Sequence, residues 1–420
     1  MSPIHPTVQV VGRALEPADH ELRDFLTRIA QPHEFIGAGS PGGKELLARI
    51  GATEADLPLV IDGDHVFKRA TVAELAKAWE VFARPVRRHY ELAIVGAGPA
   101  GLAAAVYAAS DGLSTVVAER DVPGGQASHT SMIENFFGFP EGIGGAELAR
   151  RAGRQAEQFG AELMILSGVD EGRVVDGLMR VRSDSGDEIT ADVALAAPGM
   201  VWRTLDVDGV GDLLGRGVYY GAGRSEAQQC GGDDVVVIGA GNSAGQAAMH
   251  LAGSGARVRM IVRGESLAKS MSAYLVERIE HHPLIDVRLR SRVVALHSAH
   301  GWLAAVDVSD ASGRVERLPC RALFICIGGQ PRTGWAADTG VQTDAAGYLL
   351  TGPDLLTEGR RPAGWPLDRD PLVLETSVPG IFAAGDVRHG SIKRVGGAVG
   401  EGATAVALAH RRLDELAGGG

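Results

Sequence analysis

Two stretches of this chain share one pattern, LAIVGAGPAGLAAAVYAASDGLSTVVAER (residues 92–120) and VVVIGAGNSAGQAAMHLAGSGARVRMIVR (residues 235–263). Each contains an apolar strand, a glycine-rich turn, a helix and a second strand within about 30 residues. Such units form parallel sheets with crossover helices, which predicts an α/β fold with two Rossmann-like units. The repeat therefore predicts two nucleotide-binding sites on one chain.

The first glycine turn carries a dinucleotide fingerprint. Gly96 permits a tight turn, Gly98 lets a pyrophosphate approach the backbone, and Gly101 lets the helix pack against the strand. The helix N-terminus then faces the phosphates. Glu119 ends the second strand, where a carboxylate can accept hydrogen bonds from ribose hydroxyls. The predicted contacts at this site are Gly96, Gly98, Pro99, Ala100, Gly101, Glu119 and Arg120.

The second glycine turn differs at two positions. Ala244 replaces the third glycine, which is an accepted variant, and Val262 followed by Arg263 replaces the acidic residue. A cation here suits a 2′-phosphate and predicts NADPH rather than NADH, although a solvated arginine is the alternative. Two dinucleotide sites imply a flavin reduced by a nicotinamide, so FAD and NADPH are the predicted cofactors. The predicted NADPH contacts are Gly239, Gly241, Asn242, Ser243, Ala244, Arg263, Lys269 and Gly328.

The composition limits the class of protein. The 420 residues carry 41 Lys and Arg against 52 Asp and Glu, and this charge of −11 argues against nucleic acid or an anionic membrane as partner. Three cysteines make no disulfide framework, which favours a cytoplasmic location. No run approaches the ~18 apolar residues of a membrane span, and no signal-peptide core is seen. No metal site is predicted.

Five further motifs follow the same order and spacing as in one family. With the two glycine turns, they make residues 90–415 resemble the low-molecular-weight thioredoxin reductases, which are pyridine nucleotide-disulfide oxidoreductases and are usually homodimers. The motifs are GGQASHTSMIENFFGFP (124–140), ALAAPG (194–199), ALFICIGGQPRT (322–333), TSVPGIFAAGDV (376–387) and KRVGGAVGEGATAV (393–406).

The resemblance implies contacts to the flavin. The segment from Gly124 would cradle the isoalloxazine, the Asp386 carboxylate would bind the ribityl chain, and Lys393 with Arg394 would stand beside the pyrimidine edge. A cation there would stabilise a reduced, anionic flavin, and a solvated loop pair is the alternative. Pro198 departs from the family's usual Thr. The implied contacts are Gly124, Gly125, Gln126, Asn135, Gly199, Gly385, Asp386, Lys393, Arg394 and Val395.

The redox-active Cys-x-x-Cys of these reductases is missing. Its position falls at about residues 222–225, where the sequence reads AGRS. Cys320 and Cys326 would lie on one face of a strand, roughly 20 Å apart at about 3.3 Å per residue, too far for a disulfide. Electrons are therefore predicted to leave the flavin directly, to an unassigned small-molecule or protein acceptor. Arg224 and Glu226 are candidates to line the space at the flavin, with a tightened loop without a ligand as the alternative, and Cys230 is a further candidate catalytic residue.

The N-terminal segment resembles a thioredoxin or glutaredoxin fold. Its predicted order is strand, helix, strand, helix, strand, strand, helix, and Leu57-Pro58 precedes the third strand, where that fold commonly has a cis-proline. Residues 1–88 contain no cysteine, which excludes thiol exchange by this segment because the thiolate is the nucleophile. A docking or dimerising module and a simple packing domain both remain open.

The expected architecture combines these segments. A thioredoxin-like domain (1–88) precedes an FAD domain (89–206 and 318–420) interrupted by an NADPH domain (207–317), and both Rossmann-like domains are of the three-layer ββα type. Hinges are expected near 208–217 and 314–320. A proline-rich insertion at 351–375 would cover the flavin or contact a partner.

Three functions remain open at this point. The first is an NADPH-dependent flavin oxidoreductase that passes electrons directly to its acceptor. The second is a reductase of thioredoxin or of a small disulfide, acting by direct flavin attack or through Cys230. The third is a redox-sensing or scaffolding flavoprotein with little turnover.

Overall fold

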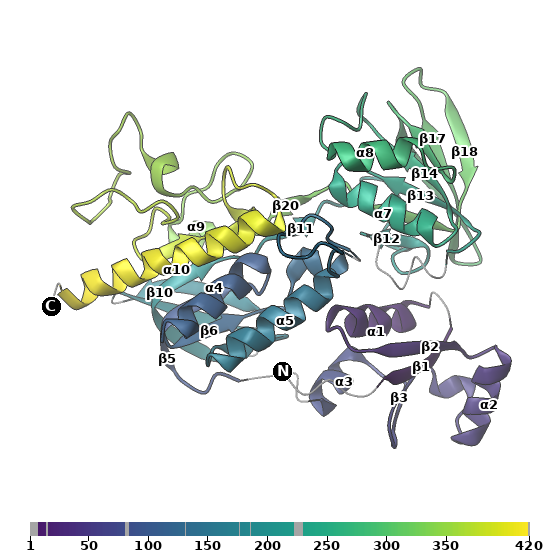
Figure 1. Cartoon of the computed structure of the whole chain (residues 1–420), viewed down its shortest axis with the longest axis horizontal. Helices are drawn as coiled ribbons and strands as arrows, with labels where there is room; N and C mark the ends of the chain where they lie inside the picture. The colour runs from purple at the N-terminus through teal and green to yellow at the C-terminus, as the bar shows by residue number, and fades with distance from the viewer. Residues whose placement is uncertain are drawn as a thin grey trace.

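The computed structural model resolves the chain into three units (Figure 1). We call them the N-terminal unit (7–79), the split unit (84–202 and 329–418) and the inserted unit (203–328). Within the described residues, no helix has both the length and the apolar character that crossing a membrane requires. The structure describes residues 7–13, 16–79, 84–130, 132–175, 177–184, 186–221 and 230–418.

The N-terminal unit contains one four-stranded sheet, in the order β2-β1-β3-β4. Side chains alternate across β1, so Val8 and Val10 pack under α1 and α3, whereas Val11 packs with α2 on the other face. The Leu57–Pro58 peptide bond is cis. The elements follow the predicted order: β1 Val8–Gly12, α1 Pro17–Arg28, β2 His33–Gly37, α2 Pro41–Arg49, η1 Glu54–Asp56, β3 Leu59–Asp62, β4 His65–Lys68 and α3 Val72–Ala78.

The split unit is built on a sheet in the order β7-β6-β5-β10-β9-β8, with β21 parallel beside β10. Helices α4, α5 and α10 lie along one face of this sheet (Figure 1). The first repeat forms β5, α4 and β6 as predicted. The elements before the insertion are β5 His89–Val95, α4 Pro99–Ser110, β6 Thr115–Ala118, η2 Gly125–His129, α5 Gly145–Gln158, β7 Glu162–Met164, β8 Val169–Val175, β9 Leu178–Ser183, β10 Glu188–Ala196 and β11 Met200–Trp202.

The second half of the split unit returns to the same sheet after the insertion. Its strand β21 packs beside β10, and its helix α10 packs beside α4, although β10 and α4 both precede the inserted unit in the chain. These elements are β20 Gly329–Pro331, α9 Ala336–Thr339, η3 Gly352–Leu355, β21 Ile381–Ala383, η4 Gly385–Val387 and α10 Val395–Gly418.

Glycine lets three backbone segments meet at the start of α4. A Cβ on Gly101 would overlap the carbonyl oxygen of Gly96, and a Cβ on Gly402 in α10 would overlap the carbonyl oxygen of Ala100. Gly96 also has φ +103°, a conformation that L side chains rarely adopt. The predicted role of Gly101 in helix–strand packing is confirmed.

The inserted unit has a parallel sheet in the order β12-β19-β13-β14-β15. Helices α7 and α8 cover one face and the antiparallel sheet β16-β17-β18 packs near the other. The second repeat forms β13, α7 and β14 as predicted. The elements are β12 Val218–Tyr220, β13 Asp234–Ile238, α7 Asn242–Gly253, β14 Arg257–Ile261, α8 Ala273–Glu280, β15 Ile285–Arg288, β16 Arg292–Ala299, β17 Trp302–Ser309, β18 Val315–Pro319 and β19 Ala322–Ile325.

Two boundaries differ from the sequence-based expectation. Strand β19 pairs with β12 and β13, so the inserted unit extends beyond the boundary at 318. The motif ALFICIGGQPRT (322–333) begins in the inserted unit and ends in the split unit. Because the motif was assigned to the FAD domain as a whole, its strand was also assigned to that domain. The chain passes from the split unit to the inserted unit at β11 and returns at β20, and these two strands pair in antiparallel fashion. Both strands lie outside the segments expected to be hinges.

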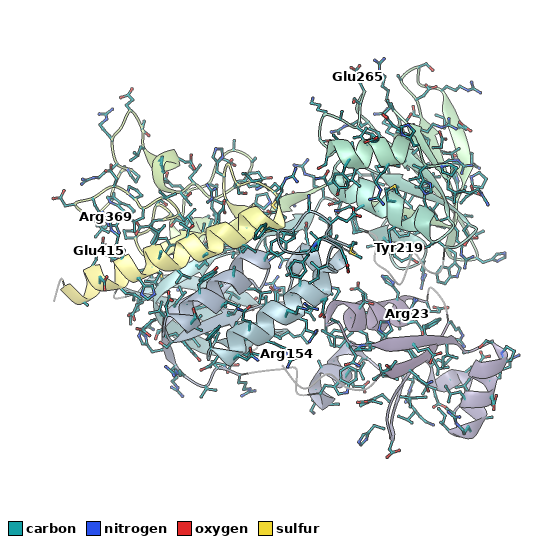
Figure 2. All side chains as sticks on the ribbon, viewed as in Figure 1. Arg23, Arg154, Tyr219, Glu265, Arg369 and Glu415 are labelled. Atoms are coloured by element: carbon teal, nitrogen blue, oxygen red, sulfur yellow. The ribbon has the colours of Figure 1, made fainter. Side chains whose placement is uncertain are left out.

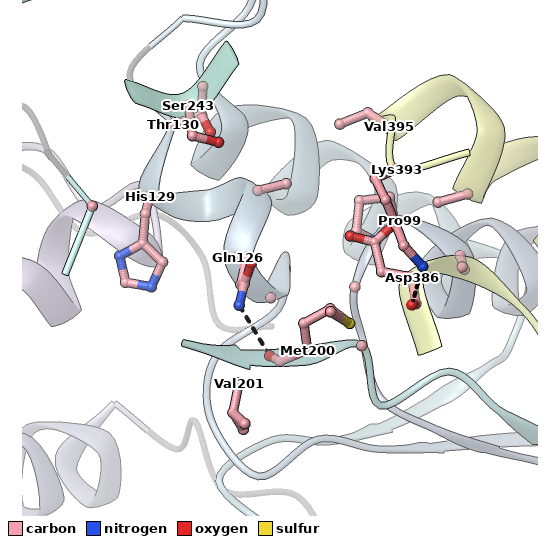
Figure 3. Close-up of a pocket in the computed structure, with 18 of the residues that line it drawn as sticks. Pro99, Gln126, His129, Thr130, Met200, Val201, Ser243, Asp386, Lys393 and Val395 are labelled. Carbon is pink, nitrogen blue, oxygen red and sulfur yellow. Dashed lines mark hydrogen bonds between the residues drawn. The ribbon is translucent and has the colours of Figure 1, made fainter. Parts of the chain in front are cut away.

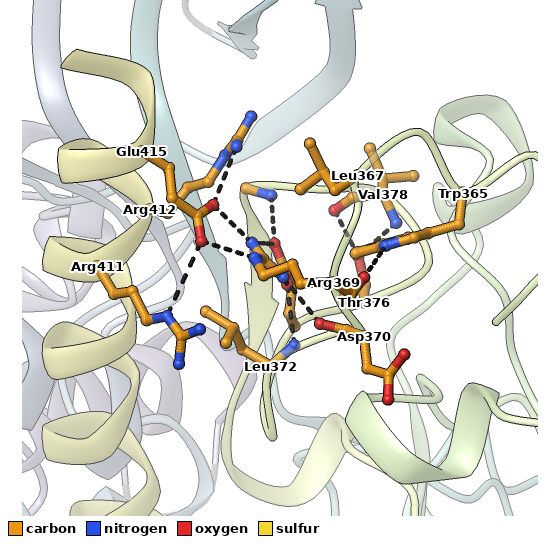
Figure 4. A network of polar contacts seen from close by, with 12 residues as sticks. Trp365, Leu367, Arg369, Asp370, Leu372, Thr376, Val378, Arg411, Arg412 and Glu415 are labelled. Carbon is orange, nitrogen blue, oxygen red and sulfur yellow. Dashed lines mark hydrogen bonds and ion pairs between the residues drawn. The ribbon is translucent and has the colours of Figure 1, made fainter. Parts of the chain in front are cut away.

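The insertion at 351–375 contains a buried ion pair, and the arginine of this pair also contacts α10 (Figure 4). The Glu375 side chain is fully buried and accepts hydrogen bonds from both terminal nitrogens of Arg369 and from the backbone N–H of Leu372 and Gly380. Arg369 also donates to Glu415 of α10, at 2.6 and 2.9 Å. Figure 2 shows Arg369 and Glu415 together at the far end of this helix.

Candidate functional site

A cavity of about 420 Å³ lies where the three units meet (Figure 3). The N-terminal unit contributes Arg28 to its wall. The inserted unit contributes Gly221, Ser243, Gln246, Ala247 and Cys326, and the split unit contributes Gly98, Pro99, Ala100, Glu119, Asp121, 125–127, His129, Thr130, 197–202, Arg332, 384–386, 393–395 and Ala398.

Two helix N-termini point into this cavity. Helix α4 begins at Pro99, next to Gly98, and α10 begins at Val395, next to Arg394. The first turns of a helix leave backbone N–H groups unpaired and carry a partial positive charge. This wall therefore suits a ligand with negative charge, such as a dinucleotide diphosphate.

Glu119 is held in place at the end of β6 by backbone donors. Its Oε2 accepts from the N–H of Ala97 at 2.7 Å, and its Oε1 accepts from the N–H of Asp121 at 2.9 Å. Burial raises the pKa of this carboxyl group. The two bonds orient the carboxylate beside the first glycine turn, as the sequence predicted for a group that receives ribose hydroxyls.

Asp386 and Lys393 lie next to each other on one side of the cavity (Figure 3). The Lys393 Nζ donates to the Asp386 carbonyl oxygen and to Ser391 Oγ (2.7 Å), and it lies 4.3 Å from the centre of the Tyr348 ring. Burial raises the pKa of Asp386 and lowers the pKa of Lys393. The ammonium is thus fixed at the cavity rather than free in solution.

The second glycine turn reaches the same cavity through Ser243 at the start of α7. Asn242 supports this turn, because its Oδ1 accepts from the Ser272 N–H at 2.7 Å. Arg263 and Lys269 are exposed beyond the end of β14, outside the cavity. The second turn therefore contributes Ser243 to the cavity, whereas both predicted cations lie outside it.

The predicted site residues divide into two groups. Arg120 lies outside the cavity and pairs with Asp170 at 3.7 Å, and Asn135 is exposed on a loop. Gly96, Gly101 and Gly124 pack behind the wall, and the other predicted NADPH contacts are not in it. Those that line the cavity are Gly98, Pro99, Ala100, Glu119, Gly125, Gln126, Gly199, Ser243, Gly385, Asp386, Lys393, Arg394 and Val395.

Among the cavity residues without a sequence-based prediction, those with charged or aromatic side chains are Arg28, Asp121, His129, Trp202 and Arg332. His129 and Trp202 lie edge to face at 6.2 Å between ring centres. His129 follows the predicted flavin segment GGQ and Arg332 lies within ALFICIGGQPRT, so motif position could have indicated both. Arg28 carries no such signal.

The three cysteines are free thiols and all are buried. Burial raises the pKa of Cys320 and of Cys326 to about 12. The predicted common face is wrong: Cys326 packs with Phe324 against α7 and α8, whereas Cys320 packs on the other side of the sheet. Cys320 precedes β19, so strand periodicity does not reach it. Arg224 and Glu226 lie outside the described residues.

The insertion at 351–375 does not reach the cavity, since none of its residues is in the wall. Its arginines pair within the insertion or with α10. Arg361 pairs with Asp368 and Asp370, and Arg360 pairs with Glu358. The expectation that this segment covers the flavin is therefore not supported, and contact with a partner stays a prediction.

Comparison with known proteins agrees with this geometry. A cavity lined by the first glycine turn and by Ser243 at the start of α7 is typical of a dinucleotide-binding protein. The family model for pyridine nucleotide-disulphide oxidoreductases matches residues 90–402. The chain belongs to this family, and its relatives make it a flavoprotein oxidoreductase of the thioredoxin-reductase type.

Thioredoxin reductases from several organisms are similar to most of this chain. The thioredoxin reductase of Bacillus subtilis is 32% identical over 329 residues, which is 78% of this chain and 96% of that protein. The thioredoxin reductase structure from T. acidophilum has a TM-score of 0.68 at 26% identity and covers 79% of this chain and 100% of its own. The structure of Lactococcus lactis thioredoxin reductase in its FR conformation has a TM-score of 0.69 at 28% sequence identity. It covers 78% of this chain and 99% of its own chain.

Proposed function

We propose that this chain is an NADPH-dependent FAD oxidoreductase that passes electrons from its flavin directly to an acceptor. One observation carries the proposal: a single cavity is lined by the first glycine turn at Gly98 and by the second at Ser243. The bound flavin would accept hydride from NADPH and deliver electrons onward. The shared cavity supports an arrangement in which the two cofactors approach each other, because both motifs contribute residues to its wall.

The residues of the cavity would hold FAD as follows. The Glu119 carboxylate would accept hydrogen bonds from the ribose, and the α4 N-terminus would bind the diphosphate. The Asp386 carboxylate would accept hydrogen bonds from the ribityl hydroxyls, and Lys393 and Arg394 would place positive charge near the ring that gains negative charge on reduction. These polar groups fit FAD, and so does the positive φ of Gly96, which permits the tight turn of the dinucleotide fingerprint.

Direct transfer is supported by the thiols of the chain. The AGRS stretch at 222–225 has no cysteine, and Cys230 is 2% exposed in the core of the inserted unit. A thiol with a pKa near 12 provides little thiolate at neutral pH, so Cys320 and Cys326 are poor nucleophiles. We therefore propose that no protein dithiol relays electrons.

An anaerobic dithionite titration tests this proposal. We expect the protein to take up a single electron pair per FAD, whereas a protein with a redox-active disulfide would take up a second pair. After reduction by NADPH, a dye, oxygen, thioredoxin and low-molecular-weight disulfides are offered as acceptors. Efficient thioredoxin reduction, or uptake of the second electron pair, would contradict the proposal.

The same samples separate the two alternative functions. If a small disulfide is reduced through Cys230, the Cys230→Ser variant loses that activity, and unchanged activity removes the thiol from consideration. If the protein is a sensor or scaffold, NADPH should reduce the flavin more slowly than about 0.01 s⁻¹. The thioredoxin-like identity of the N-terminal unit, supported by its strand order, stays part of this proposal. The homodimer and the cytoplasmic location remain predictions.

Removing the Arg263 side chain should weaken the preference for NADPH. Arg263 is exposed just beyond the end of β14, and we propose that it meets the 2′-phosphate of NADPH. For Arg263→Ala we expect kcat/KM for NADPH to fall about 10- to 100-fold, the value of one or two charge-assisted hydrogen bonds, while kcat/KM for NADH stays unchanged. Steady-state kinetics with both nucleotides measure this ratio.

Arg257, at the start of β14, provides a matched control. It pairs with Asp234 at 2.8 Å. Arg257→Ala should leave the ratio of the two kcat/KM values as in the wild type. An Arg263→Ala enzyme that retained its NADPH preference would remove this residue from the site.

A further inference from the structure

Helix α1 of the N-terminal unit contacts both other units. Arg28 donates to Asp121 Oδ2 at 2.7 Å and to Ser128 Oγ at 3.3 Å, both in the split unit. His129 Nδ1 of the split unit lies 3.8 Å from Asp24 Oδ1. Figure 2 shows Tyr219 on the side of the inserted unit that faces α1, and its ring lies 5.0 Å from that of His20 between centres. The helix therefore joins all three units.

The core of the N-terminal unit includes a residue from the split unit. Val122 is fully buried and packs in the same apolar cluster as Leu22, Leu26 and Trp79. Val122 follows Asp121, the acid that pairs with Arg28. An apolar side chain shared between two units, next to an ion pair, indicates a fixed interface rather than two domains on a loose tether.

Arg28 is both an interface residue and part of the cavity wall. Its side chain is 11% exposed and stands on the same wall as Glu119 and Asp121. The cavity has four cationic side chains (Arg28, Arg332, Lys393, Arg394) and three acidic ones (Glu119, Asp121, Asp386). Its formal charge of +1 would fall to zero without Arg28, which is unfavourable for a ligand that carries a diphosphate.

We propose that the N-terminal unit is part of the FAD site, closing the adenosine end of the cavity with Arg28. This inference rests on the proposed function, because it takes FAD as the ligand of the cavity. Docking of the N-terminal unit and binding of FAD then reinforce each other, since each buries the same guanidinium. The cysteine-free unit thus has a task in cofactor retention that needs no thiol.

The test compares FAD affinity in full-length variants. For Arg28→Ala we expect the FAD dissociation constant, measured by flavin fluorescence on the flavin-free protein, to rise about tenfold, which corresponds to about 1.4 kcal/mol. Arg28→Lys keeps the charge and should recover part of this loss. The control is Arg49→Ala, at the exposed end of α2 in the same unit, with no expected change. Added salt should weaken binding by the wild type more than by Arg28→Ala.

A second measurement requires no variant that might fold poorly. Hydrogen exchange of the α1 backbone amides in the wild type should slow when FAD is added to the flavin-free protein. Unchanged α1 exchange, or an Arg28→Ala protein that binds FAD as tightly as the wild type, would overturn this inference alone. A wild-type protein that binds no FAD would overturn both the inference and the proposed function.

Discussion

Gly402→Ala is expected to yield a protein that is purified without flavin. The added Cβ would overlap the carbonyl oxygen of Ala100, a backbone atom that cannot rotate away, so α10 must move off α4. Ala100 and Ala398 both line the cavity, and the shift would therefore open its wall. We expect a loss of about 3 kcal/mol or more in stability and at least about a 100-fold loss of FAD affinity.

Gly400, two residues earlier on α10, provides the matched control. A Cβ at this position meets no atom within 4 Å, and the residue is exposed. Gly400→Ala should retain flavin and gain up to about 1 kcal/mol from the higher helix propensity of alanine. The ratio of flavin to protein absorbance and the thermal unfolding of each variant measure both effects. Full flavin content in Gly402→Ala would contradict the close packing described for α4 and α10.

Arg369→Ala should cause the second large effect, on stability. Glu375 is fully buried, and this substitution removes the cation that neutralises it. Breaking a buried pair in this way costs about 3–5 kcal/mol, because the remaining charge has no partner. The backbone donors at Leu372 and Gly380 remain, and they satisfy hydrogen bonds but supply no positive charge. Thermal unfolding should show a Tm lower by roughly 10 °C.

The same insertion contains an exposed ion pair for comparison. Arg360 and Glu358 pair at 2.7 Å with both side chains more than three-quarters exposed. Such surface pairs contribute about 0–1 kcal/mol, so Arg360→Ala should leave the Tm nearly unchanged. Equal destabilisation by the two arginine variants would show that the insertion is not anchored through the Arg369–Glu375 pair.

Local sequence patterns predicted the parts of the fold that depend on neighbouring residues. The strand, glycine turn and helix around Gly96 and Gly239 each lie within about 30 residues, and both units formed as predicted. Motif order placed Asp386 and Lys393 at the cavity although they lie far along the chain from Glu119. Periodicity failed at Cys320, because the residue precedes the strand whose period was applied to it.

Contacts between units could not be predicted in the same way. Arg28 and Asp121 are separated by 93 residues, and neither belongs to a motif, so nothing in the sequence pairs them. Strand β19 was assigned to the wrong unit because its residues are part of a motif that crosses the boundary. These features depend on how finished units dock, which local propensity and spacing do not encode.

The order of segments in the split unit has a consequence for synthesis on the ribosome. Glu119 and the α4 turn are translated early, but Asp386, Lys393 and the α10 N-terminus, which complete the cavity, follow the whole inserted unit. A nascent chain that has reached residue 330 therefore lacks one wall of the site. FAD can therefore bind only late in biogenesis. The inserted unit can fold first, and its length adds little to the entropic cost of bringing the two halves of the split unit together.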